Sequence, residues 1–317
     1  MKNTAAVSID VDTLSSIYKG QGLNHPGGYT FIELRTGLEN IQQFFERYHI
    51  RTTLFMVGND FQLKSNQAAI QFIIKSGHEP ANHSMTHPQG FRWLNMDQKR
   101  EEIRSMGDIC ESVTGIRPIG FRSPGWNIDN SAIPLLKEMG YRYDSSVFPT
   151  SLMPLMKFAH WASMSGQAKP NRTTMGMWRY MTAPITPYQV SQSSLSKKGK
   201  SGLIEFPVSV TPFLRLPFFA TLLLKAGNKL YKTLYESIKR AGHPLHFQMH
   251  LSDFVDYSLP ELQDQIPPTR QGAYVPQALA TPLKKKLEVF GMMMDLMAAD
   301  YDFITLNAWS ERLMGSK

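Results

Sequence analysis

Apolar positions along this chain follow two alternating spacings. Short apolar runs, beginning with AAVSID at residues 5–10, have the length of buried strands, whereas longer stretches such as residues 31–50 repeat their apolar residues at helical spacing. We expect strands at residues 5–10, 51–58, 78–84, 116–124, 141–146, 202–208, 244–250 and 301–306. We expect helices between them at residues 31–50, 61–77, 94–115, 130–140, 228–242 and 281–300.

This alternation predicts one large α/β domain over residues 1–317. Strands that alternate with helices form a parallel sheet with right-handed crossovers, and seven or eight such units favour a single distorted (β/α)7–8 barrel with insertions. An open doubly wound sheet is the competing form. With 317 residues and 42% hydrophobic content, the chain can bury the core that either form needs. In both folds the ligand site lies at the carboxyl ends of the strands.

Polar residues suited to catalysis gather at the expected strand ends. They are Asp10 and Asp12 after the first strand, His83 and His87 after the third, Arg122 after the fourth, Asp144 after the fifth and His250 after the seventh. Asp10 and Asp12 point the same way if the strand continues through them. Two carboxylates and two imidazoles together suit one divalent cation, zinc above all, with water in an open coordination position.

Ordinary structural roles explain each of these residues taken alone. Asp12 and Asp144 are of a type that often closes turns, and a surface ion pair of Arg122 would contribute under about 1 kcal/mol. A lone loop histidine is usually hydrogen-bonded or solvated, which is our interpretation of His25, His49, His78, His160, His243 and His246. Since all these roles would have to coincide at successive strand ends, we favour a single site.

Five short motifs occur in an order that resembles a known family. They are SIDVDT (8–13), HSMTH (83–87), FRSPGW (121–126), YDSS (143–146) and FQMHLSD (247–253). Each is weak alone, but the ordered set is similar to that of the polysaccharide deacetylases with a NodB homology domain, carbohydrate esterase family 4. The resemblance implies metal-dependent removal of an acyl group, acetyl or formyl, from an amino sugar.

The resemblance also implies a role for each matching residue. Asp12, His83 and His87 match the metal ligands, and Asp10 matches the general base that acts on the attacking water. His250 matches the general acid, Asp144 the carboxylate that orients it, and Arg122 the partner of the base. Pro124, Trp126 and Trp178 are candidates for substrate binding. Zinc is the expected metal, and cobalt, nickel and manganese share the same ligand types.

Two departures from the usual motifs leave alternatives open. Val11 separates the two acids that are usually adjacent, which resembles the sugar-lipid deformylases and related envelope-glycan branches, and Asp10 and Asp12 could therefore exchange the base and ligand roles. Ser145 stands where a tryptophan often follows the acid of the fourth motif. Trp126 could supply that aromatic wall instead.

Two segments interrupt the alternation of strands and helices. Residues 151–202 are long and rich in aromatic, Met, Ser and Lys residues, so they could form a lid over the substrate or a flexible insertion. Residues 211–242 join an apolar run, PFLRLPFFATLLL, to a helix with several Lys and Arg residues. Such a segment could lie on an anionic membrane surface, or it could be a buried helix and turn.

Charge and targeting signals narrow the partners and the location. The formal charge is +8, but the Lys and Arg residues are dispersed and no RNA motif or basic helix is present, so we expect no nucleic-acid partner. The N-terminus lacks the apolar core of a signal peptide, and one cysteine, Cys110, fits a reducing compartment. We expect a cytoplasmic protein, peripheral to the inner membrane if residues 211–242 bind lipid.

These observations favour a metal-dependent N-deacylase of amino sugars in bacterial envelope glycan or lipopolysaccharide synthesis. One alternative is a deacetylase or deformylase whose sugar is linked to polyprenyl phosphate. A hydrolase of small amides of the ureide type would use the same fold. A catalytically idle carbohydrate-binding relative is the alternative outside enzymes, although the intact set of acids and histidines argues against it.

Overall fold

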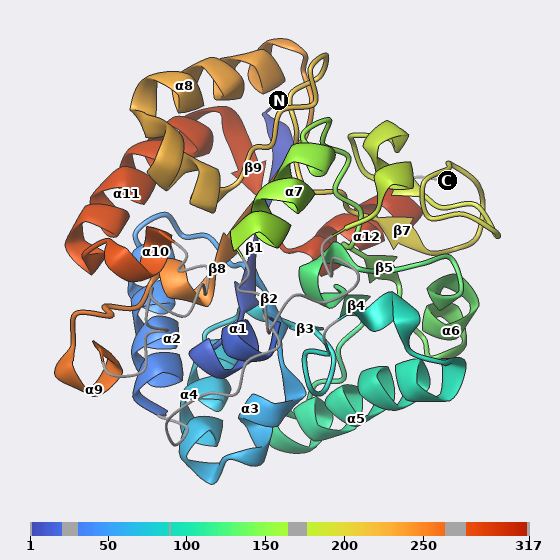
Figure 1. Cartoon of the computed structure of the whole chain (residues 1–317), viewed down its shortest axis with the longest axis horizontal. Helices are drawn as coiled ribbons and strands as arrows, with labels where there is room; N and C mark the ends of the chain where they lie inside the picture. The colour runs from blue at the N-terminus through green and yellow to red at the C-terminus, as the bar shows by residue number, and fades with distance from the viewer. Residues whose placement is uncertain (1, 21–30, 89, 164–175, 264–276, 316–317) are drawn as a thin grey trace.

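The strands lie at the centre of the molecule and helices surround them (Figure 1). This computed structural model describes residues 2–20, 31–88, 90–163, 176–263 and 277–315. The strands form one sheet in the order β6-β7-β5-β4-β3-β2-β1-β8, and β9 also pairs with β1. Their bounds are β1 (Asn3–Val11), β2 (Thr53–Met56), β3 (Glu79–Asn82), β4 (Gly120–Phe121), β5 (Tyr143–Asp144), β6 (Tyr188–Gln189), β7 (Ile204–Glu205), β8 (Leu245–His250) and β9 (Tyr301–Phe303).

All eight expected strands are present, and they pair in parallel. The additional strand β6 runs antiparallel to β7. Strands β4, β5 and β7 are each two residues long, because only those residues form ladder pairs. Because the additional strand β6 precedes it, the strand that ends at His250 is β8, the eighth strand along the chain.

The sheet curls into a distorted barrel. Its seam lies between β8 and the chain that follows β7, where Ser209 N donates to His246 O at 3.2 Å and Ser209 Oγ accepts from His246 N at 2.8 Å. These contacts join the two ends of the sheet by a loop instead of a ladder. The prediction of a distorted barrel is confirmed, and the open doubly wound alternative is wrong.

The expected helices correspond to α2, α4, α5, α6, α8 and α11. The helices of the described residues are α1 (Leu14–Gly20), α2 (Phe31–Glu46), α3 (Gly58–Gln62), α4 (Lys64–Lys75), α5 (Met96–Thr114), α6 (Ala132–Glu138), α7 (Met153–Ser163), α8 (Ala220–Arg240), α9 (Pro260–Gln263), α10 (Gln277–Ala280), α11 (Leu283–Asp300) and α12 (Leu306–Gly315), with short 3-10 turns η1 (Phe91–Trp93), η2 (Pro124–Trp126), η3 (Trp178–Thr182) and η4 (Leu251–Asp253). Within these described parts of the chain, none of the helices combines the length and the apolar content needed to span a bilayer.

Local signals set the bounds of the best-defined helix, α5. Asn95 Oδ1 accepts from Gln98 N at 2.9 Å and Gln98 Oε1 accepts from Asn95 N at 3.0 Å, which is a capping box. Gly115 ends the helix with φ +76°, a conformation that costs glycine little. By contrast, α8 begins at Ala220, before the expected residue 228, and bends at Gly227.

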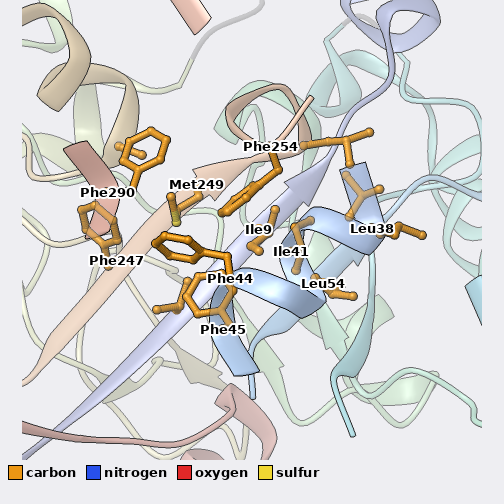
Figure 2. Close-up of a cluster of buried hydrophobic side chains, with 14 of the residues drawn as sticks. Ile9, Leu38, Ile41, Phe44, Phe45, Leu54, Phe247, Met249, Phe254 and Phe290 are labelled. Carbon is orange, nitrogen blue, oxygen red and sulfur yellow. The ribbon is translucent and has the colours of Figure 1, made fainter. Parts of the chain in front are cut away.

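The main hydrophobic core fixes the strand that carries the two acids. Figure 2 shows Ile9 of β1 among side chains of α2, β2, β8 and α11, including Phe44, Leu54, Met249 and Phe290. Residues 5–11 of β1 are all buried, because helices cover the outside of the sheet and the barrel interior covers the other face. The end of β1 is therefore a rigid base for a functional site.

The two interrupting segments are partly regular. Residues 151–202 contain α7, η3 and β6, and residues 164–175 lie outside the described part. The portion from Tyr188 to Ser201 folds back on the edge of the sheet, since Gly199 N donates to Gln189 O and Ser201 N to Val190 O. Residues 211–242 contain a tight hairpin followed by α8. The alternatives of a substrate lid and a flexible insertion therefore apply to the residues before β6.

Candidate active site

The predicted site residues come together at the carboxyl ends of adjacent strands. In the sheet, Asp10 of β1 is in register with His250 of β8 on one side and with Phe55 of β2 on the other. His83 directly follows β3 and Arg122 directly follows β4. Six of the seven residues expected at strand ends are linked here by short contacts, and Asp144 is the exception.

Asp12, His83 and His87 form a compact group of possible metal ligands. Asp12 Oδ1 lies 3.5 Å from the Nε2 atoms of both His83 and His87. In a tetrahedral zinc site with bonds of about 2.1 Å, ligand atoms are roughly 3.4 Å apart. The spacing is therefore that of atoms that share a cation. The side chains of Asp12 and His87 are 16% and 11% exposed, so water can reach the open side.

The protonation pattern also fits a cation. His83 Nδ1 donates to Arg122 O at 2.7 Å, which leaves the Nε2 lone pair directed toward Asp12. Burial lowers the pKa of His83, so the ring is neutral, as a ligand must be. Asp12 Oδ1 is buried and has no hydrogen-bond partner among the described residues. Burial, with a smaller contribution from Asp10, raises the pKa of Asp12, and a bound cation would compensate that charge.

The loop that carries His83 and His87 is held in a strained shape. Ser84 and His87 have φ values of +68° and +51°, which non-glycine residues rarely adopt. Glu102 accepts from Thr86 N and Thr86 Oγ1 at 2.8 and 2.7 Å and fixes the middle of the loop. Gly58 lies against the loop so closely that a Cβ atom there would be 3.0 Å from Met85 Cα. The surrounding structure thus imposes the aim of the two imidazoles.

Asp10 is held through both carboxylate oxygens. Arg122 Nη1 donates to Oδ1, and Gln248 Nε2 donates to Oδ2 at 2.7 Å. Gln248 is in turn oriented by Trp126, whose Nε1 donates to Gln248 Oε1 at 3.3 Å. Burial would raise the pKa of Asp10, but the Arg122 guanidinium, with His83 and His250, lowers it overall. Asp10 is therefore a fixed, ionised carboxylate beside the ligand group.

Arg122 is the centre of this network and not a surface ion pair. Its side chain is 0% exposed, lies over the Phe55 ring at 4.0 Å, and donates to Ser8 Oγ, Ser145 O and Ser145 Oγ at 2.7–2.9 Å. Ser145, where related motifs often have tryptophan, thus supports the guanidinium. The hydrogen bond from Arg122 to the Ser145 hydroxyl therefore explains the small polar residue at position 145.

Sequence reasoning missed several residues of the network. His246 Nε2 lies 2.8 Å from Ser8 Oγ, and burial lowers its pKa to about 3, so it is a neutral structural residue. Gln248 was not considered. A signal was present, because His246, Gln248 and His250 alternate along β8 and share the face of the strand that looks toward Asp10.

The expected partnership between Asp144 and His250 does not form. The carboxylate beside His250 is Asp253, whose Oδ2 accepts from His250 N at 2.9 Å while the His250 side chain accepts from Asp253 N. Asp144 instead accepts from Ser146 Oγ at 2.6 Å and hydrogen-bonds with Glu205, its neighbour across β5 and β7. The reason is the strand order, which places Glu205 of β7 directly opposite Asp144 of β5.

The three predicted substrate-binding residues lie in different surroundings. Pro124 and Trp126 are buried in η2, and Trp126 packs on Phe148 with ring centroids 4.9 Å apart. Trp126 therefore acts as a wall that also orients Gln248. Trp178 is 62% exposed, and Lys157 Nζ lies over its ring, 5.8 Å from the ring centroid.

Part of this chain is similar to known polysaccharide deacetylases. A family model described as polysaccharide deacetylase matches residues 28–143. The resemblance to the polysaccharide deacetylases is confirmed. The deacetylase match contains His83, His87 and Arg122, whereas Asp10, Asp12 and His250 lie outside it and join the same site through the fold.

Individual deacetylase relatives match only part of the chain. A peptidoglycan deacetylase-like protein of Gibberella zeae is 30% identical over 115 residues, which are 36% of this chain and 33% of that protein. A peptidoglycan-N-acetylglucosamine deacetylase of Bacillus cereus is 28% identical over 102 residues, 32% of this chain and 46% of that protein. The matched segment thus spans less than half of either relative.

A solved structure extends the likeness of the fold to the whole chain. The crystal structure from Mycobacterium smegmatis, described as a polysaccharide deacetylase, covers 99% of this chain and 92% of its own with a TM-score of 0.60. Its sequence identity of 16% supports the fold alone. The barrel fold shared with that structure therefore includes the residues on both sides of the span matched by the family model.

Proposed function

We propose that this protein is a metal-dependent hydrolase that removes an N-acyl group, acetyl or formyl, from an amino sugar of a bacterial envelope glycan. The observation that carries the proposal is the position of Asp12 Oδ1, 3.5 Å from two imidazole nitrogens, next to an ionised Asp10 and to His250. Two of the matched relatives are named a peptidoglycan deacetylase-like protein and a peptidoglycan-N-acetylglucosamine deacetylase, and these names favour a glycan substrate.

Asp12, His83 and His87 would hold the cation. The mixed set of two imidazoles and one carboxylate suits zinc best, and cobalt, nickel or manganese accept the same donors. When bound, the cation would polarise the amide carbonyl and make a water molecule more acidic. The D-x-D spacing leaves Asp12 at the open side of the site and Asp10 inside it.

Asp10 would act as the general base. Both of its oxygens are already hydrogen-bonded by Arg122 and Gln248, which supports the base role for Asp10 and the ligand role for Asp12 over the exchanged arrangement. The lowered pKa keeps Asp10 ionised at neutral pH, and the two donors fix its orientation toward the attacking water. Arg122 would hold Asp10 in place as it takes up the proton.

His250 would donate a proton to the departing amine. One ring nitrogen accepts the backbone N–H of Asp253, so the other ring nitrogen is the one available to the site. A ring nitrogen of His250 lies within 4.8 Å of a carboxylate oxygen of Asp10 and of Asp12. Asp253, and not Asp144, is the carboxylate next to His250.

Metal content and acyl release test the proposal together. The purified protein should contain about one zinc, cobalt, nickel or manganese ion by elemental analysis, and His83→Ala should lose it. His243→Ala is the matched control, since His243 precedes the amino end of β8, opposite to His250. Asp10→Asn should keep the metal and lose most release of acetate or formate from N-acylated sugar oligomers. A wild-type protein that takes up none of these metals would refute the mechanism.

A further inference from the structure

Acidic residues are almost absent from a long stretch of this chain. Between Ser145 and Tyr235 the sequence has eleven Lys and Arg residues and one acid, Glu205. Glu205 is buried beside Asp144, so it presents no charge to a partner at the surface. Lys and Arg residues occur throughout the chain, whereas almost all Asp and Glu residues lie outside this stretch. A stretch of this composition, with so few counter-charges of its own, favours an anionic partner.

The same stretch contains a hairpin with an exposed apolar tip. An isolated antiparallel bridge between Val210 and Pro217 closes residues 211–216 into a hairpin. At its tip, Phe213 and Leu214 are 92% and 69% exposed. Thr211 N donates to Leu216 O at 2.9 Å, and Leu216 N donates to Thr211 Oγ1 at 3.0 Å. The hairpin is closed by its own hydrogen bonds, so the exposure of its tip is a property of the folded chain.

Contacts from behind hold this tip outward. Arg215 Nη1 donates to Met181 O and Ala183 O at 2.8 and 2.7 Å. Thr150 Oγ1 donates to Arg215 O, and Ser151 Oγ donates to Leu214 O at 2.6 Å. The backbone of the hairpin is thus fixed to two other segments, while the two large apolar side chains remain in contact with water. A fixed, exposed apolar pair of this kind indicates a docking surface.

Basic and hydroxyl side chains lie directly beside the tip. Phe213 and one face of α8 line a surface pocket, together with Lys232, Thr233, Glu236, Ser237 and Arg240 of the helix and Ala241 just after it. Lys232, Glu236 and Arg240 are spaced by four residues and share one face of the helix. Glu236 forms an ion pair with Arg240 at 3.8 Å. Lys232 and Ser237 offer donors that suit a phosphate group, whereas the Thr233 hydroxyl already donates to Lys229 O at 3.0 Å.

We propose that the hairpin 211–216 docks on an anionic lipid bilayer. Phe213 and Leu214 enter the interfacial region, and Lys232 and Arg240 contact headgroup phosphates. An apolar tip with flanking cations is the composition of an interfacial anchor, whereas a soluble polyanion would need the cations alone. The hairpin is joined to the active site through the core, because the buried Phe219, just after it, packs on Trp126 with ring centroids 6.4 Å apart. The inference does not depend on the proposed hydrolysis.

Vesicle binding tests the docking surface directly. The full-length protein is sedimented or floated with vesicles of phosphatidylcholine alone and of phosphatidylcholine mixed with phosphatidylglycerol, without substrate or added metal. We expect binding to the anionic vesicles, and at least about tenfold weaker partitioning for the double variant Phe213→Ser, Leu214→Ser. Lys232→Glu should also weaken binding. Phe72→Ser, which removes a 48% exposed phenylalanine from α4, should bind like the wild type.

The outcomes separate this proposal from its rivals. Absence of wild-type binding to anionic vesicles overturns it. Equal binding of the double variant, with loss only at high salt, also overturns it and points to attraction of any polyanion by the basic surface. A melting temperature equal to that of the wild type shows that each variant is folded. Failure here leaves metal binding and acyl release untouched, because those are measured without lipid.

Discussion

Asp144 and Glu205 form a buried pair of carboxyl groups whose proton should be visible in the pH dependence of stability. The two residues are in register across β5 and β7 and are hydrogen-bonded to each other. Val147 N donates to Glu205 Oε1 at 2.9 Å. Burial raises the pKa of Asp144 to about 6 and, with the neighbouring carboxylate, raises that of Glu205 well above its usual value of 4.5. The pair therefore keeps at least one proton at pH 7.

The sign of the effect follows from which state holds the proton. Above pH 4.5 an unfolded chain loses the Glu205 proton, but the folded chain keeps it, so the free energy of unfolding falls as pH rises. One retained proton changes it by about 1.4 kcal/mol per pH unit. Glu205→Gln keeps an amide donor for Asp144 and an acceptor for Val147 without a titrating proton. Relative to the wild type, this variant should gain about 3 kcal/mol between pH 5 and pH 7.

Urea unfolding followed by tryptophan fluorescence at pH 5, 6 and 7 gives the required free energies. The comparison uses the difference between variant and wild type, since buried groups outside this pair titrate equally in both. Glu39→Gln, an exposed residue of α2, is the control and should follow the wild type at each pH. Wild-type and Glu205→Gln curves that stay parallel from pH 5 to pH 7 would refute the shared proton.

Three further substitutions test the contacts around the site. Arg122→Lys keeps a charge near Asp10 but loses the contacts with Ser8 and Ser145. We therefore expect a free energy of unfolding in urea that is about 3 kcal/mol lower, and a large loss of turnover. A variant with unchanged stability and turnover would contradict the central role of the guanidinium. Gln248→Leu should lower kcat about tenfold or more at unchanged metal content, because it frees one oxygen of Asp10, and an unchanged kcat would remove its positioning role. Lys286→Met should lower the free energy of unfolding by about 2–4 kcal/mol, since the buried Lys286 Nζ donates to the carbonyls of Ser252 and Val255 behind His250. Lys285 is exposed, so the control variant Lys285→Met should change the free energy of unfolding little.

The alternation of apolar runs was sufficient to predict the eight parallel strands, the barrel and the edge where the site lies. Those features depend on local spacing and on the geometry of parallel sheets, both of which are readable in one sequence. The family motifs then predicted the ligand group around Asp12. The structure adds that His83 is the neutral tautomer a cation requires, which depends on a carbonyl 39 residues away, Arg122 O.

Other features depend on contacts that spacing does not encode. Asp144 pairs with Glu205 because β7 lies next to β5, after an insertion that itself adds the antiparallel β6. The sequence gives no sign of how far that insertion carries the chain. The apolar run around Phe213 has the same composition whether it is buried or exposed, so only the hydrogen bonds of the hairpin distinguish the two. Gln248 could have been found from the alternation along β8.

The pairing of β1 has a consequence for how the chain folds during synthesis. One edge of β1 pairs with β2, about 45 residues later, but its other edge pairs with β8 and β9, which include His250 and Phe303. On the ribosome this apolar strand must wait for almost the whole chain before its second edge is covered. Slow folding and a dependence on chaperones follow for the segment that carries Asp10, and a truncation before β8 should aggregate.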